Sequence, residues 1–165
     1  MIRVCEASEL ETICEIINDA AVAYKGIIPS DRYHEPYMPM KELESEIRDG
    51  VEFWGCSDES GELIGVMGLQ DKGEVCLIRH AYVKTKIRNR GIGGKLLSHL
   101  AQATDKPILI GTWASASWAI RFYEKHGFEL VSAEEKERLL RLYWNVPDRQ
   151  IELSVVLRNG VKVNG

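Results

Sequence analysis

Three glycines lie within four positions of the segment KIRNRGIGGKLL, residues 86–97. Because glycine has no Cβ atom, the backbone around Gly91, Gly93 and Gly94 can turn tightly and direct several amide N–H groups toward one point. An apolar helical pattern follows, so the positive end of a helix dipole lies at the same place. The cationic side chains beside the glycines are Arg88, Arg90 and Lys95. The segment predicts a site for a phosphate or pyrophosphate group, and a glycine-rich turn that simply begins a helix is the alternative.

Two common phosphate-binding motifs do not fit this segment. A P-loop needs glycine where Asn89 stands and a hydroxyl side chain where Leu96 stands. A dinucleotide-binding fingerprint also needs glycine at Leu96, together with an acidic ribose partner in a βαβ unit, which is absent from the pattern. A phosphate-binding nucleotide enzyme is therefore a distant alternative.

A second candidate for chemistry lies in the strand-like run VCLIRHAYV, residues 75–83, which is apolar except for Arg79 and His80. Neighbouring residues in a strand point to opposite faces, so we expect these two side chains on opposite sides of the sheet. A histidine ring can take up and release a proton under physiological conditions, so His80 is a candidate general base, directly or through water. A hydrogen-bonded structural histidine is the alternative, and Glu74 is a weaker carboxylate candidate.

The elements that position these residues follow from hydrophobic periodicity and turn residues. Ser8 and Glu11 are expected to form a capping box for a first helix that ends near residue 23. The helices are expected at about 8–23, 40–49, 93–103 and 117–126, with a helix or irregular arm at 134–144. The strands are expected at 2–4, 51–57, 63–70, 75–83, 108–113, 128–132 and 150–157. This order predicts an α/β (mixed α+β) fold with a mixed, mostly antiparallel sheet and helices on both faces.

Two segments carry a resemblance to a known family. YVKTKIRNRGIGGKLL resembles the strand and Arg-x-x-Gly-x-Gly loop of the Gcn5-related N-acetyltransferases (GNAT family). Its matching residues are Val83, Arg88, Gly91 and Gly93. WAIRFYEKHGFE resembles a later region of the same family. Its matching residues are Ala119, Tyr123, Gly127 and Phe128. The resemblance covers nearly the whole chain, is weakest in residues 24–40 and beyond about 133, and implies the GNAT acyl-CoA N-acyltransferase fold.

The resemblance implies transfer of an acetyl group from acetyl-CoA, as co-substrate, to a primary amine by direct attack in a ternary complex. It implies Tyr123 as the general acid for the departing thiolate, with a core aromatic residue as the alternative. Ala116 stands where many relatives have asparagine, so Ser115, Ser117 or the backbone are substitute candidates for cofactor contact. The cofactor-binding residues expected on this basis are Tyr82, Val83, Arg88, Asn89, Arg90, Gly91, Ile92, Gly93, Gly94, Lys95 and Ser117.

The acceptor amine is not identified by any sequence feature. Residues 24–40 are rich in aromatic residues and proline, and in the resembling family this region closes over the acceptor. We therefore expect Tyr33 and His34 to contact the substrate, although plain packing is an equal alternative. The acceptor remains open between an amino acid, a polyamine, an aminoglycoside-like drug and a protein amine.

Composition limits the remaining classes. The chain has 165 residues, 45% of them hydrophobic, and a formal net charge of -4, which predicts one domain over residues 1–165 and no nucleic-acid partner. The cysteines lack metal-ligand spacing and are expected as reduced thiols, so we expect no metal and a cytoplasmic protein. There is no signal layout and no apolar run near the roughly 18 residues of a membrane span, so we expect no membrane partner. A homodimer and a non-catalytic CoA-binding or interaction protein with the same fold stay open as alternatives.

Overall fold

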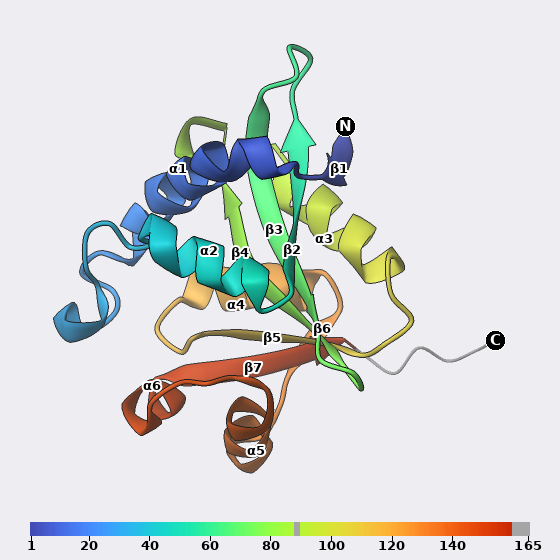
Figure 1. The fold of residues 1–165 in the computed structure, drawn as a ribbon. Helices are drawn as coiled ribbons and strands as arrows, with labels where there is room; N and C mark the ends of the chain where they lie inside the picture. Colours follow the sequence, from blue (N-terminus) through green and yellow to red (C-terminus); the bar gives the residue numbers. More distant parts are fainter. Residues whose placement is uncertain (88–89, 160–165) are drawn as a thin grey trace.

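The computed structural model describes residues 1–87 and 90–159, and its strands form one sheet in the order β1-β2-β3-β4-β5-β7-β6 (Figure 1). The strands are β1 (Ile2–Val4), β2 (Val51–Ser57), β3 (Leu63–Asp71), β4 (Cys76–Val83), β5 (Ile108–Trp113), β6 (Phe128–Leu130) and β7 (Ser154–Asn159). Strands β4 and β5 pair in parallel, and the other neighbouring strands pair antiparallel. The predicted mixed, mostly antiparallel sheet is confirmed.

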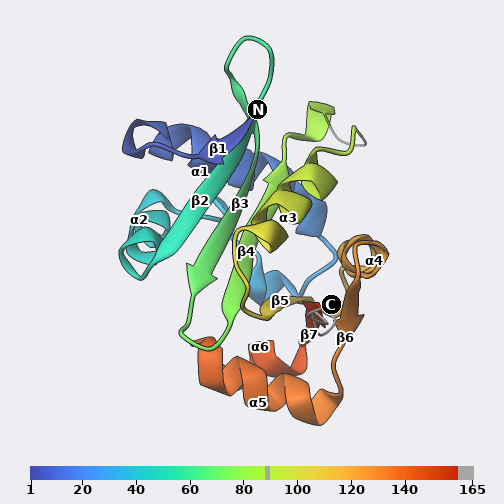
Figure 2. The ribbon, with the colours of Figure 1, turned by 90° about the vertical axis from the view of Figure 1, so that its right-hand side faces the viewer.

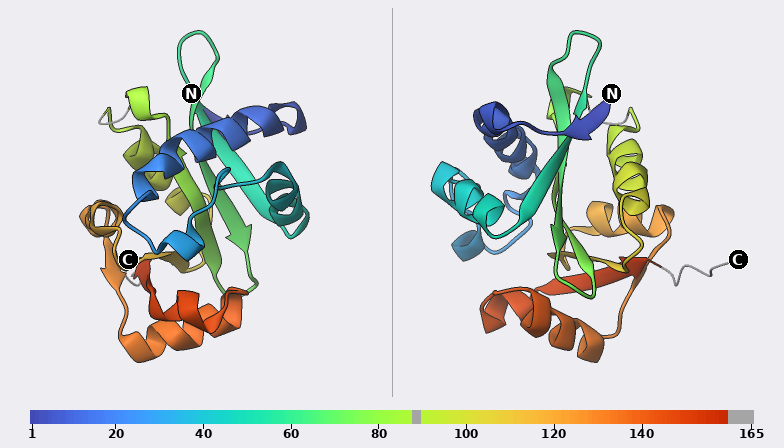
Figure 3. Two further views of the ribbon diagram at one scale, coloured as in Figure 1. Left: turned by 90° about the vertical axis from the view of Figure 1, so that its left-hand side faces the viewer. Right: turned by 45° about the vertical axis from the view of Figure 1, so that its right-hand side comes forward.

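Helices cover both faces of this sheet, as predicted. The main helices are α1 (Leu10–Ala21), α2 (Met40–Arg48), α3 (Ile92–Gln102), α4 (Ser117–Lys125), α5 (Ala133–Tyr143) and α6 (Asp148–Glu152). Figure 3 shows α1 and α2 on one side of the sheet and α3 and α4 on the other. Helix α3 lies across β3 and β4 (Figure 2). No helix among the described residues is both long enough and apolar enough to cross a membrane.

The strand alternation sorts apolar side chains into a core on each face. On β2, Val51 and Phe53 pack with the α1 and α2 side of the sheet, whereas Cys56 packs with the α3 side. On β4, Leu77 packs with α5 and α6, and Ile78 packs with α3. Successive side chains of a strand point to opposite faces, so one short run supplies both cores. The strands therefore form a rigid central layer on which the site residues are placed.

Strands β4 and β5 are paired only over a short stretch of the described residues. Their register pairs Cys76 with Ile108 and Ile78 with Ile110, and no pairing is found further along either strand in the described residues. Figure 1 shows β5 and β7 running in a different direction from β2, β3 and β4. The sheet is therefore split beyond Ile78 and Ile110, and this split opens space between the two strands.

Two sequence expectations differ from the structure at element ends. The first capping box uses Glu6 and Glu9, before a 3₁₀ turn at Ala7–Glu9, instead of Ser8 and Glu11. The glutamate pair satisfies the corresponding free backbone groups two residues earlier. The run expected as a strand over 150–157 begins as the end of α6, because Pro147 precedes a helical turn, and β7 begins at Ser154. The segment 134–144, left open between helix and arm, lies within α5 apart from its last residue.

Candidate active site

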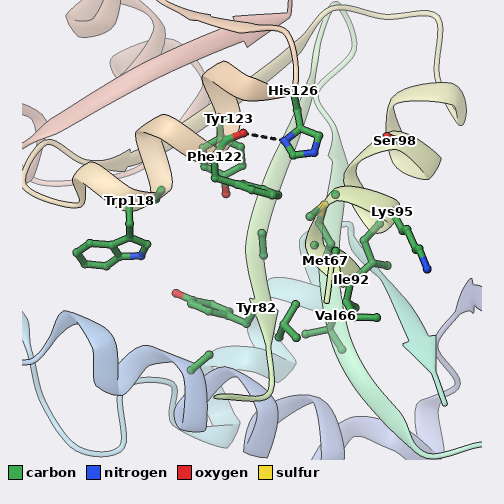
Figure 4. A pocket seen from close by; sticks show the side chains of 18 of the residues that line it. Val66, Met67, Tyr82, Ile92, Lys95, Ser98, Trp118, Phe122, Tyr123 and His126 are labelled. Atoms are coloured by element: carbon green, nitrogen blue, oxygen red, sulfur yellow. Dashed lines mark hydrogen bonds between the residues drawn. The ribbon is translucent and has the colours of Figure 1, made fainter. Parts of the chain in front are cut away.

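Two cavities formed by described residues adjoin the split between β4 and β5, and the larger lies between α3, α4 and the free half of β4, with a volume of about 1170 Å³. Figure 4 shows Tyr82 of β4, Phe122 and Tyr123 of α4 and Ile92 of α3 around it. Its wall combines backbone from the start of α3 with apolar and aromatic side chains. Such a long, mostly apolar cleft that ends at a helix N-terminus is suited to an extended ligand with an anionic group.

The glycine-rich segment forms the N-terminal end of α3, and its glycines have different structural roles. Gly91 is the N-cap residue and has a left-handed backbone with φ of 76°, and no side chain caps the helix there. The first N–H groups of a helix have no partner within the helix, so uncapped donors are present at this edge of the cavity. Gly91, Gly93 and Gly94 all line the cavity. The start of α3 thus brings uncapped backbone donors to one wall of the cavity, and their use as an anion site stays a prediction.

Gly93 and Gly94 lie inside α3 and allow α4 to approach it. A Cβ atom on Gly93 would lie 3.2 Å from Cζ of Phe122, and one on Gly94 would lie 2.6 Å from Nε2 of His126. His126 is held in place because its Nδ1 lies 2.8 Å from the carbonyl oxygen of Phe122 (Figure 4). These glycines therefore act through the packing of α3 on α4, which the sequence pattern did not indicate.

The predicted cofactor-binding residues are only partly brought together. Those that line the larger cavity are Tyr82, Val83, Gly91, Ile92, Gly93, Gly94 and Lys95. Arg90 and Ser117 are exposed and line neither cavity. Arg88 and Asn89 lie outside the described residues. Ala116 is buried against Ile28 and Trp113, so this position is part of the core below α4.

A smaller cavity of about 160 Å³ lies on the other side of the split between β4 and β5. It is lined by both strands, by Tyr24 and Tyr37 from the chain between α1 and α2, and by Trp144 and neighbours from the α5–α6 region. The described residues that line both cavities are Tyr24, Ala81, Tyr82 and Tyr123. Two ligands, one in each cavity, would therefore meet beside Tyr123.

His80 lies at a bulge in β4. Gly68 pairs with Arg79 and Val66 pairs with Tyr82, so His80 and Ala81 together oppose one residue of β3. His80 has a left-handed backbone with φ of 55°, which is uncommon for a residue other than glycine. A bulge bends its strand, which accounts for the divergence of β4 from β5. It also changes the direction of the next side chain.

The expectation that Arg79 and His80 point to opposite faces is wrong, because the bulge brings both to Glu46 of α2. Nη2 of Arg79 lies 2.8 Å from Oε1 of Glu46, and Nε2 of His80 lies 2.8 Å from Oε2. Burial pushes the pKa of Glu46 up, but contact with His80 and Arg79 outweighs burial and holds the pKa of this carboxyl below its ordinary value. Glu46 is therefore an ionised partner for both side chains.

Sequence reasoning missed Glu46, although one signal was present. Leu43 is fully buried on the inner side of α2, and Glu46 lies one turn later on that side. An acidic side chain at an inward position of an amphipathic helix calls for a cationic partner. The other carboxylate candidate, Glu74, is exposed, lines neither cavity and accepts a hydrogen bond from the Tyr143 hydroxyl at 3.5 Å.

Buried tyrosines surround the place where the cavities meet. Burial raises the pKa of Tyr123 well above its ordinary value, and the neighbouring Tyr24 raises it further. Burial and the neighbouring Tyr37 raise the pKa of Tyr24 to about 12. The pKa of Tyr82 is raised for the same reason, burial first. The phenol of Tyr123 therefore keeps its proton at neutral pH and can act as a donor.

Tyr33 and His34 line neither cavity. Both stack on Tyr37, with ring centroids 6.0 Å and 6.4 Å away, and Tyr37 lines the smaller cavity. The same segment is tied to α6, because Arg149 donates to both carboxylate oxygens of Asp31 at 3.0 and 3.1 Å. The predicted acceptor residues therefore support the cavity wall from behind.

Comparison with known sequences gives one family. Residues 49–130 match the sequence model of the acetyltransferase (GNAT) domain. This chain belongs to the GNAT acetyltransferase family. The matched part of this GNAT protein runs from just before β2 to the end of β6 and includes the glycine-rich segment and Tyr123. A comparison with curated protein sequences gives no match.

Solved structures of GNAT proteins share the fold. A GNAT acetyltransferase from Staphylococcus aureus Mu50 has 20% identity and a TM-score of 0.69, with 98% of this chain and 99% of that chain covered. The ribosomal-protein-S18-alanine N-acetyltransferase from Escherichia coli has 16% identity and a TM-score of 0.71, with 100% and 96% covered. PaiA N-acetyltransferase from Thermoplasma acidophilum, solved with coenzyme A, has 18% identity and a TM-score of 0.66, with 96% and 97% covered.

The GNAT site carries no sign of a metal centre in the described residues. Residues 1–87 and 90–159 contain no group of three or more His, Cys, Asp or Glu side chains placed to hold a metal ion. All four cysteines are free thiols. The polar groups beside the cavities include backbone donors, tyrosines and the set of Glu46, Arg79 and His80, which together are suited to proton transfer and anion binding.

Proposed function

We propose that this GNAT protein transfers an acetyl group from acetyl-CoA to a primary amine by direct attack in a ternary complex. The observation that carries the proposal is the pair of cavities that meet at Tyr24, Ala81, Tyr82 and Tyr123, in the split between β4 and β5. Two substrates that enter from opposite sides of the sheet would bring their reacting atoms to one place. This arrangement needs no covalent acetyl-enzyme, since proximity supplies much of the rate.

The residues of the larger cavity fit acetyl-CoA. The uncapped start of α3, at Gly91 to Gly94, supplies N–H donors for the pyrophosphate, and Lys95 adds a cation at the same cavity wall. The wall formed by Tyr82 and Val83 on β4 suits the pantetheine arm, since β4 lacks a paired neighbour on this side beyond Ile78 among the described residues. When bound, acetyl-CoA supplies a thioester that is open to attack by an amine.

His80 and Tyr123 supply proton transfer in this proposal. A C–N bond forms to the acetyl carbonyl carbon while the C–S bond breaks, which gives an amide and the free thiol of CoA. His80, which lines the smaller cavity, accepts the amine proton directly or through water. Tyr123 donates a proton to the departing sulfur, and solvent returns a proton from His80 to Tyr123 before the next turnover.

Two measurements test the proposal. Calorimetry should give tighter binding for CoA than for pantetheine, which lacks the pyrophosphate. A thiol-release assay with acetyl-CoA and a panel of primary amines should then give turnover that depends on the amine. Equal affinity for CoA and pantetheine would contradict the assigned anion site. Tight CoA binding without turnover of any amine would support the alternative of a non-catalytic CoA-binding protein.

A further inference from the structure

The size and lining of the smaller cavity indicate the chemical class of the acceptor amine. The inference drawn from them rests on the proposed function. We infer that the acceptor is a small primary amine with a single aromatic ring, of the arylalkylamine class. The cavity wall combines the free ends of β4 and β5 with aromatic side chains from four other parts of the chain. The aromatic residues of the two strands are Tyr82 and Trp113, and those of the other four parts are Tyr24, Tyr37, Tyr123 and Trp144.

The rings are fixed by contacts with one another and with the backbone. Tyr24 lies 5.7 Å from Tyr37 and 6.4 Å from Tyr82 between ring centroids, the latter edge-on. Nε1 of Trp113 donates to the Tyr37 hydroxyl at 3.5 Å. Trp144 lies so close to β5 that a Cβ atom on Gly111 would be 3.2 Å from its Cζ2. Rings held this way form a preformed slot that stacks favourably on another ring.

The charges around the cavity argue against a second charged group on the acceptor. Arg79 and His80 are the titratable cations among the described lining residues, and no Asp or Glu is among them. The nearby carboxylate, Glu46, is already paired with both. Nη1 of Arg79 also donates to Oε1 of Gln70 at 3.3 Å. A second ammonium of a polyamine, or the carboxylate of an amino acid, would therefore be desolvated without a partner, which is costly.

Size argues for a single ring. The volume of about 160 Å³ is below the roughly 300–1,000 Å³ usual for drug-sized ligands. The contact of Asp31 with Arg149 closes the chain segment before α2 against α6, beside Tyr37 and Gln150 of the cavity wall. One ring on a short alkyl chain fills such a space. Its ammonium group gains from the faces of Tyr24 and Tyr37 and releases one proton to solvent, and the neutral amine then gives a second proton to His80 as the C–N bond forms.

The test is a thiol-release comparison of kcat/KM for phenylethylamine, cyclohexylethylamine, spermidine, phenylalanine and a lysine-containing peptide. The kcat/KM for phenylethylamine should exceed that for spermidine, phenylalanine and the peptide by about ten-fold or more, because each of these carries a further charge that would stay unpaired. It should exceed the kcat/KM for cyclohexylethylamine by about three-fold or more, because only phenylethylamine has a ring that stacks on the aromatic wall. Preference for spermidine, the amino acid or the peptide overturns the inference, and so does equal use of the saturated amine.

Variants at the slot sharpen this test. Trp144→Ala enlarges the cavity and should raise the kcat/KM ratio of tryptamine to phenylethylamine about five-fold or more, with Trp144→Phe as the milder version. Trp54→Ala is the matched control, since Trp54 is on β2 and packs on His99 of α3 at 5.1 Å, away from this cavity. A ratio that is unchanged in both Trp144 variants overturns the inference.

A binding measurement separates this inference from the proposed function. Saturation-transfer NMR on the protein with CoA should detect phenylethylamine and not spermidine. If no amine is turned over but phenylethylamine still binds, the proposed reaction fails and the assigned ligand class stands. If spermidine binds and phenylethylamine does not, the ligand class fails whether or not the protein is an enzyme.

Discussion

Nε2 of His80 lies 2.8 Å from Oε2 of Glu46, across the gap between β4 and α2. Neither atom has a well-aligned hydrogen-bond partner among the described residues, and their side chains are 15% and 13% exposed. Since the pKa of Glu46 is below its ordinary value, its ionised carboxylate favours a proton on Nε2. The Nδ1 atom of a neutral ring is then left to accept a proton, so Glu46 acts as a positioning residue for His80.

Glu46→Gln should weaken the fold at neutral pH, slow the reaction, and bring the stability of the two proteins closer together in acid. The folded-state pKa of Glu46 is depressed, so its ion pairs stabilise the fold above the ordinary pKa of about 4.3 and this stabilisation is lost as the pH falls below it. Denaturant unfolding across this range should show a flatter acid dependence in the variant than in the wild type. Glu44→Gln, on the same helix but outside the ion pair, should keep the wild-type slope. Equal slopes in all three proteins would contradict the prediction.

His80→Asn should separate the backbone role of His80 from its proposed proton transfer. Asparagine tolerates the left-handed backbone that His80 adopts, so the bulge should persist and the melting temperature should fall less than in His80→Ala. Loss of the imidazole should lower turnover about 100-fold or more and change the shape of the pH–rate profile. His80→Ala serves as the comparison. A pH–rate profile like that of the wild type would return His80 to a structural role.

The strands were predicted well where the signal is local. The ranges 51–57 and 108–113 agree with β2 and β5 because turn or polar residues bound a short apolar run. The run beginning at Gln150 was misjudged because one helical turn after Pro147 cannot be distinguished from alternation over so few residues. Local patterns thus predict long elements and miss the short turn of α6.

Site residues that belong to a local sequence motif were predicted. Features of the site that depend on pairing between strands were missed. The glycines at the start of α3 have a local signature, and so has Tyr123. The bulge at His80 arises because β3 supplies one residue opposite two of β4, and nothing within β4 indicates this. Its consequence, the convergence of Arg79 and His80 on Glu46, follows from tertiary packing and has no local signal.

Tyr123→Phe tests the phenol without disturbing its packing. Burial raises the pKa of Tyr123, so the phenol keeps its proton and is expected to stabilise the departing thiolate through a hydrogen bond. Turnover should fall about 10- to 1000-fold, with acetyl-CoA affinity nearly unchanged. Tyr143→Phe is the matched control, because Tyr143 lines neither cavity. Wild-type turnover in Tyr123→Phe would mean that water or another group is the acid.

Gly93→Val should remove most of the CoA affinity through a steric contact between α3 and α4. A Cβ atom at this position would already lie 3.2 Å from Cζ of Phe122, and the two methyl groups of valine extend further. The start of α3 must then move away from α4, which displaces the backbone donors of Gly91 and its neighbours. Gly93→Ala, which requires a shift of a few tenths of an ångström, should cost little affinity.

The same substitution distinguishes an anion site from a general loss of shape. Calorimetry should show a loss of about ten-fold or more for CoA in Gly93→Val and a much smaller loss for pantetheine, because only CoA carries the pyrophosphate that the helix N-terminus is proposed to bind. Phe122→Ala removes the ring that valine would meet. The double variant Phe122→Ala, Gly93→Val is compared with Phe122→Ala alone. The loss of CoA affinity between these two proteins should be smaller than the loss that Gly93→Val causes in the wild type. Equal losses for CoA and pantetheine would show that the start of α3 shapes the cavity without binding the phosphates.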